Sequence, residues 1–188
     1  CIRDRVQLVS GDRILIHSAE GGVGLAAIQY AQQVGAEIFA TASPSKHAFL
    51  RSIGVHNIST SRDAKVFADE MKTMVEERGV DVVLNTLTSG DYIRNTVNLM
   101  APKGRFMEIS KRNIWTQEQM SEIRPDITYC TYTLNEVLAH TPERLLPMLQ
   151  NLSEEVENGT VKPLPAEVFD MRTKLKEAFK RLQSGKVI

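Results

Sequence analysis

Short apolar runs alternate with longer amphipathic segments through the first 132 residues of the chain. The apolar runs predict buried strands over 13–17, 37–41, 80–84, 105–109 and 127–132, with a strand-like link at Ile58. Helical spacing of apolar residues predicts a helix over 22–34 with Gly35 as its C-terminal stop, and further helices over 44–54, 63–78, 92–100 and 116–123. In the helix over 63–78, Val66, Met71, Met74 and Val75 are expected to point inward. Because several strands are apolar throughout, the pattern favours a parallel sheet with helices on both faces. We predict an α/β fold with a doubly wound, Rossmann-like parallel sheet.

The pattern changes in the last quarter of the chain. Pro142 is acceptable at a helix start, whereas Pro147 inside the same apolar pattern predicts a kink or two short helices. Two prolines make 161–165 extended, and an amphipathic helix is expected over 173–182. This part of the chain is therefore not expected to continue the alternation of strand and helix.

The two ends of the chain lead us to expect a piece of a longer protein. The chain begins with Cys1 rather than Met, and residues 1–12 read as a helix tail and a turn. Residues 186–188 look like the opening of a strand. We therefore divide the chain into an α/β domain over 1–160 and a return segment over 161–188.

The first predicted strand leads into a glycine-rich turn that opens the first helix. The turn has the spacing Ala19-x-Gly21-x-x-Gly24, with Gly22 and Val23 inside it. A small first residue allows the tight turn, Gly21 lets a pyrophosphate approach the backbone, and Gly24 lets the helix pack closely on the strand. The N–H groups of the helix start would then face the phosphates. We predict a dinucleotide site here, and the alternative is a plain strand–turn–helix corner.

Composition narrows the class of protein. Apolar residues make up 42% and charged residues 24% of the chain, which is typical of a folded soluble domain. The 23 basic and 23 acidic residues cancel, which argues against a broad surface for nucleic acid or membrane. No apolar run is long enough to span a bilayer, and the start is not a signal peptide. Because the cysteines and histidines form neither a disulfide framework nor a metal motif, we expect a cytoplasmic protein without a metal.

The residues after the second strand bear on the choice of nicotinamide cofactor. In this fold an acid at that place binds the ribose 2′-hydroxyl and selects NAD. Here the strand end has hydroxyls and a lysine instead, which suit a 2′-phosphate. We predict NADPH, with Ser43 and Lys46 at the 2′-phosphate and Arg62 as a candidate at the adenine end. The alternative for Lys46 is a solvated side chain at a helix start.

Polar residues at two later strand ends are candidates for the nicotinamide site, because ligands in open α/β sheets lie beyond the carboxyl ends of the strands. Asn85 and Thr86 follow one strand, and Lys111 follows the next. Lys111 is the best candidate for chemistry, since a cation there can donate a proton or stabilise a developing enolate. The alternative is a loop lysine that contacts only water. Glu108 is expected to be a polar residue on a face of the sheet.

Several stretches together resemble the enoyl reductase domains of modular polyketide synthases and fatty acid synthases, in the medium-chain dehydrogenase/reductase superfamily. In chain order these stretches are 17–24, 39–43, 59–63, 79–87, 104–111 and 162–165. They span nearly the whole chain in the family's order. The resemblance covers mainly the nucleotide-binding subdomain of such a reductase.

The resemblance implies NADPH-dependent reduction of an α,β-unsaturated thioester held on an acyl carrier protein, without a metal. Hydride reaches the β-carbon and a proton reaches the α-carbon. Lys111 falls where the family has its proposed proton-donating lysine, whereas Thr133 stands in the place of an aspartate and is a poorer acid. The family also implies a β-rich substrate-binding domain whose N-terminal part lies outside this chain, other synthase domains as partners, and dimer formation as an option.

Three other functions remain open. A variant within the family closes a cyclopropane ring, and a free-standing quinone oxidoreductase shares the Gly-Gly-Val-Gly turn. A cofactor-binding module without catalytic activity is the third. The stretches Ser-Arg-Asp at 61–63 and Lys-Arg-Asn-Ile-Trp at 111–115 favour the synthase form.

Overall fold

A six-stranded parallel sheet forms the centre of the chain in the computed structural model, which describes residues 6–184. The strands run in the order β3-β2-β1-β4-β5-β6. Their bounds are β1 Arg13–Ile16, β2 Glu37–Ala42, β3 Asn57–Thr60, β4 Val80–Asn85, β5 Met100–Glu108 and β6 Thr128–Thr131. Because neighbouring strands are parallel, their carboxyl ends share one edge of the sheet. The predicted doubly wound fold is confirmed, and its winding reverses between β1 and β4.

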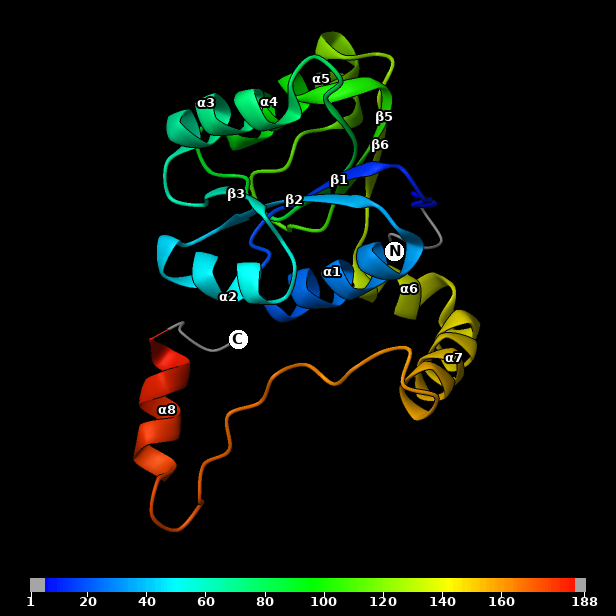
Figure 1. Cartoon of the computed structure of the whole chain (residues 1–188). Coiled ribbons are helices and arrows are strands. Elements are labelled where there is room, and N and C mark those ends of the chain that lie inside the picture. Colours follow the sequence, from blue (N-terminus) through cyan, green and yellow to red (C-terminus); the bar gives the residue numbers. More distant parts are fainter. Residues whose placement is uncertain (1–5, 185–188) are drawn as a thin grey trace.

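Alternate side chains of the strands fill two separate cores, one on each face of the sheet. The helices that cover the sheet are α1 Gly22–Val34, α2 His47–Ser52, α3 Ala64–Val75, α4 Tyr92–Asn98 and α5 Gln117–Ile123. Ile14 and Ile16 of β1 join the core that includes α1 and α2, while Leu15 joins the core that includes α3, α4 and α5. Figure 1 shows the two helix layers on opposite sides of the sheet. Burial on both faces explains why the strands read as apolar runs.

Local capping fixes where several helices begin and end. Gly35 ends α1 with φ 77°, a left-handed conformation that glycine adopts without strain, as its sequence position predicted. The Asp63 carboxylate accepts the N–H groups of Lys65 and Val66 at the start of α3. Thr116 forms a capping box at the start of α5.

The helix predicted over 63–78 is shorter in the structure, and a slightly different face of it points into the core. It ends at Val75, because Glu76 has φ 54° and leaves the helical conformation. Val66 was expected to point inward, but it is 42% exposed, and its neighbour Phe67 occupies the core instead. The prediction was wrong for Val66 because the inward face of α3 is set by Phe67, Met71 and Val75.

The segment after β6 contains a helix that was not predicted, α6 Leu134–His140. It is followed by a 3₁₀ turn at Pro142–Arg144 and by α7 Leu145–Glu157. The helical segment therefore does divide, but the break precedes Pro147. Pro147 lies in the first turn of α7, where a missing N–H removes no helical hydrogen bond.

The return segment starts as extended chain and ends in α8 Leu175–Gln183. Helix α1 holds its start: Gln29 exchanges hydrogen bonds with the Lys162 backbone, and Gln33 donates to the carbonyl of Thr160, directly before the segment. Figure 1 shows α8 apart from the sheet. The strand expected at 186–188 lies outside the described residues, as do residues 1–5, and residues 6–12 contain no helix.

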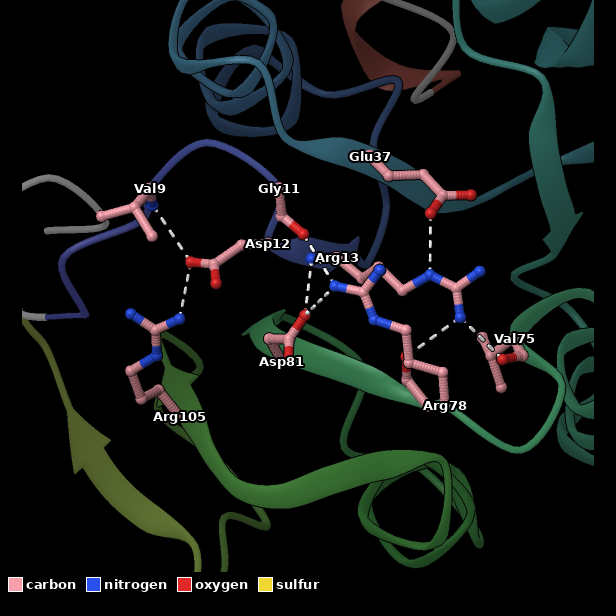
Figure 2. A network of polar contacts seen from close by, with 10 residues as sticks. Val9, Gly11, Asp12, Arg13, Glu37, Val75, Arg78, Asp81 and Arg105 are labelled. Atoms are coloured by element: carbon pink, nitrogen blue, oxygen red, sulfur yellow. Dashed lines mark hydrogen bonds and ion pairs between the residues drawn. The ribbon is translucent and has the colours of Figure 1, made fainter.

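Charged side chains tie the strands together at the amino edge of the sheet, opposite the glycine turn (Figure 2). The Arg13 N–H donates to Asp81 at 2.8 Å, and its guanidinium binds Glu37 at 2.7 Å. Arg105 binds Asp12 at 2.6 Å. These contacts join β1, β2, β4 and β5 at an edge that carries none of the predicted site residues.

Candidate functional site

The glycine turn has the close packing that its spacing predicted. A Cβ added at Gly24 would lie 2.6 Å from the Ala19 backbone, which only glycine avoids. A Cβ added at Gly21 would meet only the Ser18 carbonyl, at 3.5 Å. Gly24 is therefore required by the fold, whereas the fold itself would tolerate a side chain at Gly21. This difference fits the expectation that Gly21 leaves room for a ligand.

The start of α1 presents backbone donors at this turn. The N–H of Leu25 makes the first helical hydrogen bond, to the Gly21 carbonyl at 2.8 Å. No side chain caps this helix end, and its first turn carries no acid. The N–H groups of Gly22, Val23 and Gly24 therefore remain suited to an anion, and the helix dipole favours one. These residues fit a dinucleotide pyrophosphate, and Val23, 57% exposed, lies at the rim.

His17 fixes the turn from inside the protein. Its ring is 1% exposed, with Nδ1 3.0 Å from Thr41 Oγ1 and Nε2 2.9 Å from Thr96 Oγ1. Burial lowers the pKa of His17 to about 3, so the ring is neutral near pH 7. Thr41 Oγ1 also accepts the Ser18 N–H at 3.1 Å, which ties the turn to β2. His17 is thus a positioning residue beneath the turn.

An acid reaches the end of β2 from the glycine turn, although β2 itself ends without one. Glu20 Oε1 accepts the Ser43 N–H at 3.0 Å, while Oε2 is buried with no hydrogen-bond partner in the described chain. Ser43 and Lys46 lie together in the short 3₁₀ turn that follows β2, where the Lys46 N–H binds the Ser43 carbonyl. The structure thus brings the two predicted 2′-phosphate residues together. It also adds Glu20, which sequence spacing did not single out.

Arg62 lies on the same side of the site as these residues. Ala42 at the end of β2 pairs in register with Thr60 at the end of β3, and Arg62 follows two positions later. Its N–H donates to Thr60 Oγ1 at 3.1 Å, and its side chain is exposed. This placement is compatible with the predicted contact at the adenine end.

Asn85 and Thr86 connect the end of β4 to both of its neighbours. Asn85 Nδ2 donates to Glu108 Oε2 on β5 at 2.5 Å, and Thr86 Oγ1 donates to the His17 carbonyl at 3.1 Å. Glu108 Oε1 accepts the Ser110 N–H at 2.7 Å. Glu108 was expected on a face of the sheet, but it is fully buried at the carboxyl edge, and this burial raises the pKa of its carboxyl group.

Lys111 follows this buried cluster and is exposed. Within residues 6–184 no hydrogen bond or ion pair holds its side chain, so the ammonium group is free to meet a ligand. Thr133, for which the sequence resemblance predicted the position of an aspartate, caps a helix in the structure. Its Oγ1 accepts the Glu136 N–H at 3.3 Å and caps α6.

The described residues present neither a metal-binding cluster nor a membrane-spanning helix. Across residues 6–184, no group of three or more His, Cys, Asp or Glu side chains is arranged to hold a metal ion. No helix in the same part of the chain has the length and apolar character needed to cross a bilayer.

Comparisons with known proteins agree with this geometry. The family model for Zinc-binding dehydrogenase matches residues 22–154. Polyketide synthase GfsB of Streptomyces halstedii is 36% identical over 98% of this chain and 3% of the synthase. The CurF ER cyclopropanase from the curacin A biosynthetic pathway is 40% identical, with a TM-score of 0.89, over 97% of this chain and 54% of its own. The nucleotide-binding subdomain of the enoylreductase domain of PpsC from Mycobacterium tuberculosis is 34% identical, with a TM-score of 0.76, over 87% of this chain and 92% of the subdomain.

The fold and these relatives define a nucleotide-binding domain of the medium-chain dehydrogenase/reductase type. The chain belongs to the zinc-binding dehydrogenase family, and within it to the nucleotide-binding part of the polyketide synthase enoyl reductases. It spans 3% of the curated GfsB synthase and about half of the CurF chain. The resemblance seen in the sequence motifs is confirmed.

Proposed function

We propose that this chain is the NADPH-binding half of an enoyl reductase that acts on an α,β-unsaturated acyl thioester carried by an acyl carrier protein. The observation that carries the proposal is the glycine turn, whose helix N–H groups lie at the same sheet edge as Asn85, Thr86 and the Lys111 loop. The likeness to the enoylreductase domain of PpsC supports the reaction class.

Different residues of the chain bind different parts of NADPH. The N–H groups of Gly22, Val23 and Gly24 hold the pyrophosphate. Ala19 allows the tight turn, and Gly21 leaves room for the pyrophosphate to approach the backbone. Ser43 and Lys46 bind the 2′-phosphate, and Arg62 flanks the adenine. Asn85 and Thr86 border the nicotinamide.

Reduction needs a hydride at the β-carbon and a proton at the α-carbon of the thioester. NADPH supplies the hydride when it is bound. Lys111 donates the proton, or stabilises the enolate until a proton arrives, because its side chain is exposed and follows the strand end that borders the nicotinamide. Thr133 is a poorer acid than a carboxyl group, and its hydroxyl oxygen accepts the Glu136 N–H at the start of α6.

The chain works in this proposal as part of a larger cytoplasmic synthase. Residues 1–160 form the NADPH-binding domain, and residues 161–188 lead toward a substrate-binding domain. Other domains of the synthase and the carrier-bound thioester are its partners.

The direct test follows NADPH oxidation by the full-length synthase protein that contains this chain, with crotonyl-pantetheine as the substrate. We expect one saturated thioester formed for each NADPH consumed, and strong loss of turnover in Lys111→Ala. A folded protein that binds NADPH but reduces no enoyl thioester would overturn the reaction and favour a non-catalytic module.

Formation of a cyclopropane ring is a second candidate, because the CurF ER cyclopropanase, at 40% identity, is about as similar to this chain as the CurK enoyl reductase, at 43%. Both reactions begin with hydride delivery to the β-carbon, but ring closure also requires the resulting enolate to displace a leaving group at the γ-carbon. The test substrate is therefore an enoyl thioester that carries a halogen at the γ-carbon. Mass spectrometry of the carrier-bound product therefore decides between a saturated chain and a ring. Reduction of free quinones in place of thioesters would instead indicate a quinone oxidoreductase.

A further inference from the structure

The carboxylate of Glu20 lies where this fold normally selects between NAD and NADP. An acid at the end of β2 favours the ribose 2′-hydroxyl, and cationic or hydroxyl groups there favour the 2′-phosphate. In this chain the acid is Glu20 of the glycine turn, whose carboxylate accepts the Ser43 N–H at the end of β2. We propose that Glu20 lowers the preference of the site for NADPH over NADH, so that the chain binds both nucleotides. The inference rests on the proposed nicotinamide site.

The hydrogen bond of Glu20 removes a phosphate donor. Ser43 offers its backbone N–H and its hydroxyl at the predicted 2′-phosphate position, and Glu20 Oε1 already accepts the N–H at 3.0 Å. The hydroxyl of Ser43 and the ammonium group of Lys46 remain for a phosphate. A backbone N–H is among the best-placed donors to an anion, so its loss weakens the 2′-phosphate subsite.

The charge of Glu20 acts in the same direction. A phosphate monoester carries between one and two negative charges near pH 7 and is repelled by a carboxylate at contact distance. A ribose 2′-hydroxyl carries no charge and can donate a hydrogen bond. Glu20 Oε2 is buried without a donor, which is costly for a carboxylate oxygen. The repulsion therefore weakens binding of the 2′-phosphate and leaves binding of the uncharged 2′-hydroxyl unaffected.

The acid on the neighbouring strand end is already engaged. Asp63, which follows β3, accepts the N–H groups of Lys65 and Val66 and caps α3. Lys46 opposes Glu20 from the 3₁₀ turn after β2 and favours the phosphate. The balance between Glu20 and Lys46 therefore sets the selectivity.

The test is calorimetric titration of the chain with NADPH and with NADH, comparing the ratio of the two Kd values. Glu20→Gln keeps the oxygen that accepts the Ser43 N–H but removes the charge, and we expect it to shift the ratio about tenfold toward NADPH. Glu20→Ala should shift it in the same direction, and Lys46→Ala in the opposite one. Glu154→Gln, which removes an exposed acid on α7, is the matched control and should leave the ratio unchanged. The Glu20→Gln shift should shrink at high salt, because the repulsion is screened.

Two failures can be told apart. If the wild-type chain is folded by circular dichroism but binds neither nucleotide, the proposed function falls, and this inference falls with it. If both nucleotides bind and Glu20→Gln leaves the ratio unchanged or shifts it toward NADH, only the inference about Glu20 is overturned.

Discussion

The side-chain amide of Asn85 donates a hydrogen bond to the buried carboxylate of Glu108, at the carboxyl ends of β4 and β5. The two residues also face each other in the register of these strands. The other oxygen of Glu108 accepts the N–H of Ser110, directly before Lys111. Glu108 therefore joins the strand end that borders the predicted nicotinamide to the loop that carries the predicted proton donor.

The burial of Glu108 predicts a pH dependence of stability. Because its pKa is raised in the folded chain, the folded state holds this proton more tightly than the unfolded state. Its contribution to stability is full below the ordinary carboxyl pKa and is lost as the pH rises through the folded pKa. The free energy of unfolding of the wild type, minus that of Glu108→Gln, should therefore fall as the pH rises above about 4.5. Urea denaturation at several pH values measures it, with Glu122→Gln on α5 as the exposed control. A difference that does not change with pH would contradict the burial argument.

His17 predicts the opposite trend on the acid side. Its pKa is about 3 in the folded chain and about 6.5 in an unfolded one, so unfolding takes up a proton between these values. The stability of the wild type should fall as the pH drops from about 6.5 toward 3. His17→Gln should lose less stability over that range, whereas His56→Gln, at an exposed position, should behave like the wild type. Equal slopes for the wild type and His17→Gln would contradict a buried neutral ring.

Two glycines of the turn differ in what the fold requires of them. Gly24 is packed too closely to carry a side chain, whereas Gly22 has room for one. Gly24→Ala places a Cβ 2.6 Å from the Ala19 backbone, and we expect it to lower the free energy of unfolding by about 1–3 kcal/mol. Gly22→Ala places its Cβ 3.6 Å from a Leu164 methyl group, an ordinary contact, and should leave stability unchanged or raise it by up to about 1 kcal/mol. Thermal and urea unfolding measure both. Equal stability for the two variants would contradict the packing assigned to Gly24.

Lys111 should matter for turnover and not for nucleotide affinity. In the full-length synthase protein, Lys111→Ala should lower kcat about 10²- to 10⁴-fold, the usual contribution of a positioned general acid. The Kd for NADPH should change little, because the ammonium group acts on the thioester. Arg112→Ala, the adjacent exposed cation, is the control. Parallel losses in both variants would indicate a general effect of loop charge.

Much of the fold could be predicted because its signals are local. The apolar run of β1, the glycine turn and the C-terminal Gly35 lie in one stretch, and α1 spans the range expected from them. The strand-end positions of Asn85 and Lys111 followed from the same reasoning, since parallel strands place their carboxyl ends at one edge. The prediction of which residues of α3 point inward was wrong for Val66. Val66 and Phe67 are both apolar, so only packing decides which of them is buried.

The internal contacts of the site could not be read from the sequence. His17 contacts Thr41 and Thr96, which are 24 and 79 residues away along the chain. Glu20 looked like an ordinary variable position of the turn, and its reach to Ser43 depends on how β1 and β2 pair. The capping role of Thr133 depends on α6, whose pattern was not seen. The contacts of His17 and Glu20 are fixed by tertiary structure and leave no spacing in the sequence, whereas the Thr133 cap is local and its Thr-x-x-Glu spacing at 133–136 was a signal that could have found it.

The central claim is that the glycine turn binds a nicotinamide dinucleotide, and titration of the chain with NADPH tests it most directly. We expect one NADPH for each chain, with affinity at least about tenfold weaker in Gly21→Val, because the new side chain fills the space through which a pyrophosphate reaches the backbone. Ala139→Val, which adds the same kind of bulk at an exposed position of α6, should bind like the wild type. Equal NADPH affinity in folded Gly21→Val and wild type, or no binding by the folded wild type, would contradict the account.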